Sequence, residues 1–202
     1  MPRRAVTEPI RGERHGDVSN NSESKTHRVL LETYAANDRM NQLILGQIDP
    51  GAWRVNTPQL KRQEGRTIAA IFAHLHNNRL VWLKRSAPHL RCPAALDPSR
   101  CTIRQAASAH RKSAASCLQM LEEALSEDPG RRVTQFSRGS WAPVWPAGAT
   151  MFAYMLTHEA HHRGQILALA HQLGYRLPEQ AAYGIWDWDR IWKELGFETG
   201  PR

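Results

Sequence analysis

The chain has 202 residues, a length typical of one domain with a single buried core. Hydrophobic residues make up 41% of it, yet no stretch approaches the roughly 18 consecutive apolar residues of a membrane-spanning helix. The N-terminus is charged and lacks the apolar segment of a secretory signal. We therefore expect a cytoplasmic protein that does not bind membranes.

The formal net charge of +8 suggests a nucleic-acid partner, because Lys and Arg release counterions from phosphate. The basic residues are scattered, however, and no helix-turn-helix or aromatic-rich strand motif accompanies them. The charge therefore favours a general attraction for anionic small molecules over specific DNA or RNA binding. The three cysteines are odd in number and form no CxxC motif, which argues against a disulfide framework and a cysteine-based zinc site.

Residues 1–24 are polar and lack any apolar period, which predicts a disordered tail ahead of one domain over residues 25–198. A first helix is predicted from Thr26, because apolar side chains then recur three or four residues apart as far as Ile48. Asn37 lies on that apolar face, where an Asn most often caps a neighbouring backbone group and less often lines a pocket.

A second helix is predicted from Thr67, a good N-cap, to just before Ser86. It contains two histidines, His74 and His76. On a helical wheel His76 lies about 80° and His74 about 120° from the centre of the apolar face, so the wheel alone mildly prefers His76 as an inward-pointing ligand.

A third helix is predicted from Thr102 to the stop at Asp128, and its lone His110 is typical of packing rather than of a ligand. The fourth predicted helix, residues 150–174, is the most informative. His158 and His162 lie four residues apart on its apolar face, so both imidazoles can approach the same atom. Buried histidines with ordinary hydrogen bonds remain an alternative unless a third ligand comes from another helix.

The last segment is short and aromatic, and its tryptophans are expected to cover the open end of the fold: Trp186, Trp188 and Trp192. Four long helical patterns without a strand pattern predict an all-α four-helix bundle with a short C-terminal aromatic segment or helix.

The segment from His158 to His162 formally matches HExxH, in which the Glu of a metalloprotease acts as general base. The longer metzincin pattern HExxHxxGxxH is not matched, because Gln165 stands where that pattern requires Gly and Ala168 stands where it requires His. Glu159 would also point about 100° away from His158 on the helix, which disfavours it as a base at a shared metal.

Read further, HEAHHRGQI resembles the DinB/YfiT-like superfamily, whose last bundle helix carries HxxxH followed by Arg-Gly-Gln. Residues 73–75, Ala-His-Leu, resemble the corresponding part of its second helix, and residues 34–37 resemble its aromatic and Asn pattern in the first helix. The resemblance covers about residues 28–197.

This resemblance implies that the metal ligands are His74, His158 and His162, which overrules the preference of the wheel for His76. An outer role near the site is then open to His76, and Arg163 and Gln165 are expected to hold the helix and its neighbours by hydrogen bonds rather than to catalyse.

The resemblance further implies a homodimer and a divalent metal ion, with zinc and nickel both suited to three imidazoles. Three protein ligands leave an open coordination position, as in catalytic sites. The implied function is that of a metal-dependent enzyme acting on a small molecule, as a thiol-dependent transferase using a low-molecular-weight thiol or as a hydrolase. The alternatives are a non-catalytic metal-binding stress-response bundle and a basic DNA-associated protein.

Overall fold

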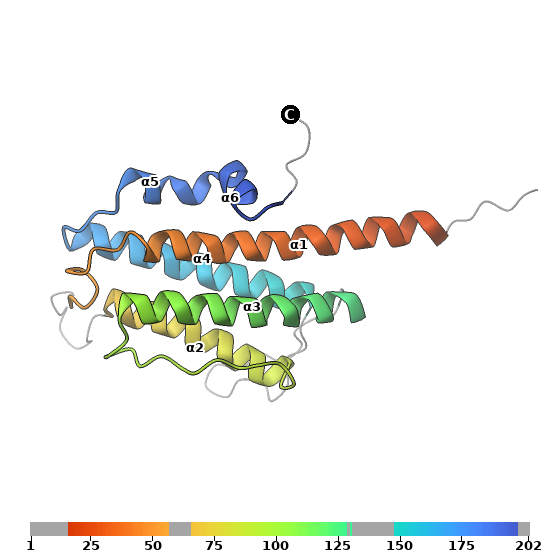
Figure 1. The fold of residues 1–202 in the computed structure, drawn as a ribbon, viewed down its shortest axis with the longest axis horizontal. Coiled ribbons are helices and arrows are strands. Elements are labelled where there is room, and N and C mark those ends of the chain that lie inside the picture. The colour runs from red at the N-terminus through yellow and green to blue at the C-terminus, as the bar shows by residue number, and fades with distance from the viewer. Residues whose placement is uncertain (1–15, 57–65, 129, 131–147, 198–202) are drawn as a thin grey trace, which may run out of the picture.

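The computed structural model describes residues 16–56, 66–128, 130 and 148–197. Four long helices dominate it (Figure 1): α1 (Gly16–Leu45), α2 (Ile68–Ser86), α3 (Ile103–Glu127) and α4 (Ala149–Gln172). The described ranges contain no strand. The predicted all-α four-helix bundle is therefore confirmed.

The helices form a closed ring in which α1 and α2 each pack against both α3 and α4. Helices α1 and α2 are thus diagonal to each other. This arrangement brings α2 and α4 side by side, although the whole of α3 separates them in the sequence. The two helices that carry the predicted metal ligands are therefore neighbours.

Two of the helices begin at the predicted residues. Thr67 caps α2 by accepting a hydrogen bond from the backbone N–H of Ala70 at 3.1 Å, and Thr102 forms a reciprocal capping box with Gln105 at the start of α3. Each hydroxyl satisfies a backbone donor that has no partner within its helix. These caps fix where α2 and α3 start.

Helix α1 begins at Gly16, earlier than the Thr26 predicted from the apolar pattern. Residues 16–24, predicted as tail, are helical in their backbone, while residues 1–15 lie outside the described part. Adding a residue to an existing helix fixes one residue for one hydrogen bond, whereas starting a helix fixes several. A helix already held by packing can therefore extend through a polar segment that has no apolar face.

The core consists of two apolar clusters stacked along the bundle. One contains the buried apolar side chains between Ile68 and Leu75 of α2 and between Ile166 and Ala170 of α4. The other contains those between Leu80 and Leu83 and between Met151 and Met155 of the same helices. Buried polar side chains lie between these segments on every helix: Asn37, Asp38, Asn41, His76, Arg79, His110, Ser113, Glu159, His162 and Arg163. A polar layer thus crosses the middle of the bundle.

The C-terminal segment forms α5 (Glu179–Ala182), a 3-10 turn η1 (Gly184–Trp186) and α6 (Trp188–Glu194). All three pack along α1 (Figure 1). Trp188 packs on the core, but Trp186 is 73% exposed, so the prediction that Trp186 covers the end of the bundle was wrong. The aromatic segment lies against the side of the bundle.

Among the described residues, none of the helices combines the length and apolar character needed to cross a membrane. The three cysteines are free thiols; Cys101 and Cys117 are buried and Cys92 is partly buried.

Candidate metal centre

The three histidines that the sequence motif selects lie together. His74 comes from α2, and His158 and His162 come from successive turns of α4. One ligand atom of each lies within 4.8 Å of those of the other two, and the ring centroids are 4.6–5.3 Å apart. The cluster could hold a metal ion. A histidine from another helix therefore joins the pair on α4.

Burial keeps these imidazoles neutral, which is the form that binds metals. Burial, reinforced by His162 and by the nearby charge of Arg66, lowers the pKa of His74 from 6.5 to about 4. Burial and the neighbouring His162 and His74 lower the pKa of His158 to about 4. Burial also lowers the pKa of His162, against the opposing effect of its hydrogen bond to Gln165.

Gln165 orients His162. The Oε1 atom of Gln165 lies 2.7 Å from Nδ1 of His162, and its Nε2 atom lies 2.9 Å from Nε2 of His161. With Nδ1 of His162 donating to Oε1, the Nε2 atom of His162 keeps a free lone pair. Outer partners of this kind fix the tautomer and ring angle of a ligating histidine. Gln165 therefore has the predicted structural role, which is to hold the rings of His161 and His162 by hydrogen bonds.

Asn78 is a fourth polar group at the cluster, and the sequence analysis missed it. Its Nδ2 atom lies 3.0 Å from Nε2 of His158 and 3.3 Å from Nε2 of His74. Because one atom reaches both nitrogens, the two Nε2 atoms face a common point. The available signal was spacing, since Asn78 follows His74 by four residues just as His162 follows His158.

Two aromatic rings cover the side of the cluster that lies toward the N-terminal half of α4. The ring of Tyr154 stacks on His158 with centroids 5.9 Å apart, and the ring of Trp82 meets the same imidazole edge-on at 5.6 Å. The Nδ1 atom of His158 is buried and has no hydrogen-bond partner within the described ranges. Packing against the two aromatic rings and the contact of Nε2 with Asn78 therefore hold the His158 ring.

His76, which the helical wheel preferred, lies away from the cluster. Its Nδ1 atom is 3.1 Å from Oγ of Ser113 and its Nε2 atom is 2.9 Å from the carbonyl oxygen of Ala94. His110 is fully buried, contacts the carbonyl oxygen of Phe72 at 2.9 Å, and burial lowers its pKa to about 3. Both histidines tie α2 to neighbouring segments, and the packing role predicted for His110 agrees with this.

Glu159 is buried and forms a two-point ion pair with Arg79. Nε and Nη2 of Arg79 donate to its two carboxylate oxygens, each at 2.7 Å. Burial alone would raise the pKa of Glu159, but the charge and hydrogen bonds of Arg79 outweigh it and lower the pKa to about 2. A carboxylate whose two oxygens are both bonded to Arg79 is not available as a general base. This agrees with the prediction from its position about 100° from His158 on the helix.

The ion pair extends into a network across the bundle. Asn37 and Asn41 of α1 each donate to Oε2 of Glu159 at 2.7 Å, and Arg163 donates to the side-chain oxygens of both. Asp38 accepts from Nη1 of Arg79 at 2.8 Å. Asn37 thus bridges two charged groups rather than capping a backbone. The hydrogen bonds predicted for Arg163 are present.

Arg79 was also missed by the sequence analysis. On the wheel it lies only about 20° from the centre of the apolar face of α2, where a charged residue must be buried. A buried Arg requires a buried acid. That requirement points to Glu159, because Glu159 is an acidic residue within the otherwise apolar pattern of α4.

Two hollows lie beside α2. One, of about 470 Å³, is lined by the start of α2 and by two arginines: Arg54, Asn56, Arg66, Thr67, Ala70, Pro98 and Ser99. Ala70 precedes His74 by one turn, so this hollow lies next to the cluster.

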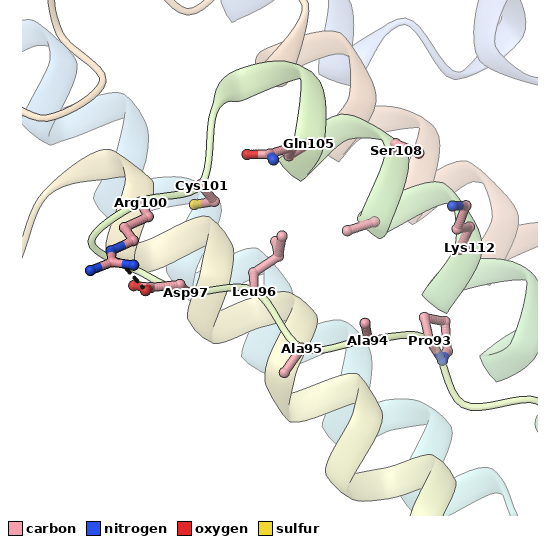
Figure 2. A pocket seen from close by; sticks show the side chains of 11 residues that line it. Pro93, Ala94, Ala95, Leu96, Asp97, Arg100, Cys101, Gln105, Ser108 and Lys112 are labelled. Atoms are coloured by element: carbon pink, nitrogen blue, oxygen red, sulfur yellow. Dashed lines mark ion pairs between the residues drawn. The ribbon is translucent and has the colours of Figure 1, made fainter.

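Figure 2 shows the second hollow, between the connection from α2 to α3 and the first turns of α3. Its volume is about 380 Å³, and its wall includes the ion pair of Asp97 and Arg100 at one end and Lys112 at the other (Figure 2). Helix α2 lies behind this connection, and α4 lies behind α2 (Figure 2). This hollow therefore lies apart from the histidine cluster.

The fold and the site together define a class: an all-α bundle whose second and fourth helices carry a three-histidine cluster able to hold a metal ion. The model of the DinB family matches residues 19–194, and the chain belongs to the DinB family. No curated protein and no solved structure matches it.

Proposed function

We propose that this chain is a metal-dependent enzyme acting on a small molecule, with a divalent ion, zinc or nickel, held by His74, His158 and His162. The observation that carries the proposal is the convergence of three neutral imidazoles within 4.8 Å. Such a donor set suits both metals. A metal bound there would supply a Lewis acid that polarises an oxygen or sulfur atom of the substrate.

The surroundings favour an anionic substrate or co-substrate. Arg66 lies near enough to lower the pKa of both His74 and His162 by its charge. Arg54 lines the same hollow, although its guanidinium also donates to the carbonyl oxygens of Ser99 and Cys101. Cations beside a partly enclosed site attract anions. A low-molecular-weight thiol with a carboxylate, reacting as its thiolate, fits this chemistry, so we place a thiol-dependent transferase first and a hydrolase second.

A non-catalytic metal-binding bundle is the second candidate, because one observation favours it. The cluster draws its residues from two adjacent helices, so a bound ion would tie α2 to α4 without any substrate. The two candidates differ in whether a thiol can reach the metal.

The test is thiol binding to protein loaded with nickel or cobalt, followed by absorption spectroscopy. Cysteine and glutathione serve as the probe thiols. A thiolate-to-metal charge-transfer band in the wild type and in His76→Gln, absent in His158→Gln, is the expected result. Consumption of the thiol with an alkylating electrophile, and ester cleavage without thiol, then separate transferase from hydrolase. A loaded protein that binds neither thiol and turns over neither substrate would favour the non-catalytic candidate.

A further inference from the structure

We propose that Asn78 is a fourth metal ligand, through its side-chain oxygen, so that α2 and α4 each contribute a pair of ligands one helical turn apart. The inference rests on the proposed metal site and adds to it a residue outside the three-histidine motif; a thiol would then take a fifth position, to which a zinc site can expand. His74 and Asn78 form the pair on α2, and His158 and His162 form the pair on α4.

The distances around Asn78 are those of a ligand. Two atoms that are each about 2.0–2.1 Å from one metal ion lie roughly 2.9–3.4 Å apart, depending on whether they subtend a right angle or a tetrahedral angle. The side-chain amide nitrogen of Asn78, Nδ2, lies 3.0 Å from Nε2 of His158 and 3.3 Å from Nε2 of His74. It therefore stands at ligand-to-ligand distance from two of the three imidazoles at once.

The chemistry of the amide matches both states of the site. Without a metal, the imidazole lone pairs require a donor, and the NH₂ group of Asn78 supplies it. A cation in the same place would repel the N–H dipoles and require an acceptor instead. A half-turn about the last side-chain bond exchanges the amide nitrogen for the amide oxygen with almost no change of shape. Asn78 can thus meet either requirement from one backbone position.

The placement of Asn78 is rigid enough for this role. It lies within α2, adjacent to the buried Arg79, whose ion pair with Glu159 links α2 to α4. Asparagine also has only two side-chain torsions, so little conformational freedom is lost on binding. Asn77, the preceding residue, faces elsewhere: its side chain bonds the backbone N–H and C=O of Leu96, each at 2.9 Å.

The experiment compares the affinity for zinc, by competition with a chromogenic chelator, and the visible spectrum of the cobalt form. Asn78→Leu keeps the shape and removes the oxygen, and Asn78→Asp keeps an oxygen and adds charge. Asn77→Leu is the matched control on the same helix. Circular dichroism of each metal-free variant verifies that the bundle is formed.

Asn78→Leu is expected to weaken zinc binding by at least about 10-fold, the lower range for loss of a group that supports a metal site. Its cobalt spectrum should change because the donor set changes. Asn78→Asp should bind zinc at least as tightly as wild type, and Asn77→Leu should bind it equally.

Two results would overturn the inference. Unchanged or tighter zinc binding in Asn78→Leu would mean that Asn78 serves only the metal-free histidines. Weaker binding with an unchanged cobalt spectrum would place Asn78 outside the coordination sphere. A wild type that takes up no metal is a different result, because it would refute the proposed metal site itself.

Discussion

Glu159 is fully buried in the polar layer and receives hydrogen bonds from Arg79, Asn37 and Asn41. Removing one partner of a buried ion pair leaves the other charge uncompensated, at a cost of about 3–5 kcal/mol. Glu159→Gln should therefore lower the free energy of unfolding by about that amount at pH 7. The comparison change Glu32→Gln, which removes a longer, partly exposed pair with Arg28 at 3.7 Å, should cost no more than about 1 kcal/mol.

The same pair gives stability a defined pH dependence. The pKa of Glu159 is about 2 in the folded chain and has an ordinary value of 4.5, so the unfolded chain binds the proton more readily. Its contribution is complete above pH 4.5 and is lost as the pH falls through about 2. Denaturant unfolding between these pH values should show a steeper loss for wild type than for Glu159→Gln. Equal slopes would contradict the ion pair.

Gln165 should control metal affinity without touching the metal. Gln165→Leu removes the acceptor for Nδ1–H of His162 and is expected to weaken zinc binding by about 10–100-fold. Gln119→Leu on the surface of α3 is the control, since Gln119 bonds only Glu123 among the contacts seen. Equal zinc affinity in Gln165→Leu and wild type, measured by chelator competition, would show that packing alone orients His162.

Helical spacing alone paired His158 with His162, because it restricts where a side chain can point, whereas His74 was selected by the resemblance to the DinB family. Sequence reasoning missed Asn78 and the partner of Glu159 for a physical reason: a carboxamide has no preferred metal partner, and an ion pair across two helices depends on how they pack. The helical wheel wrongly preferred His76, because the angle of a side chain from the apolar centre of α2 does not tell which neighbouring helix lies on that side. His74 and Asn78 flank α4, and His76 contacts the connection to α3 instead.

At the scale of helices, the cap of α2 supports the site. Thr67→Ala removes its hydrogen bond to Ala70 and should cost about 1 kcal/mol of stability. Thr102→Ala at the start of α3 should cost a similar amount, because it removes an equivalent cap. Zinc affinity should fall only in Thr67→Ala, since α2 carries His74 and α3 carries no residue of the cluster. Equal affinities in both variants would show that packing fixes α2 independently of its cap.

The helix starts that the sequence predicted correctly are those with such local caps. The start of α1 has no cap signal in the sequence, and its polar first turns carry no apolar period. The C-terminal segment was placed wrongly at the end of the bundle, because large aromatic residues reveal that a surface is covered but not which one.

At the scale of the molecule, a metal that binds only the folded bundle must stabilise it. At a free zinc concentration 100 times the dissociation constant, the gain is about 2.7 kcal/mol. Zinc should raise the unfolding temperature of wild type and leave that of His158→Ala unchanged. A shift of equal size in both would assign the binding to another part of the chain. The homodimer and the cytoplasmic location stay predictions, and light scattering of the metal-loaded protein tests the first.

The central claim is a resident metal on three named histidines, and elemental analysis of protein purified without a histidine tag tests it most directly. Wild type and His76→Ala should each carry close to one divalent ion per chain, while His74→Ala and His158→Ala should carry almost none. Circular dichroism checks that every variant is folded. Wild type that holds no metal, and takes none up on dialysis against zinc or nickel, would contradict the account and leave the cluster as packing histidines.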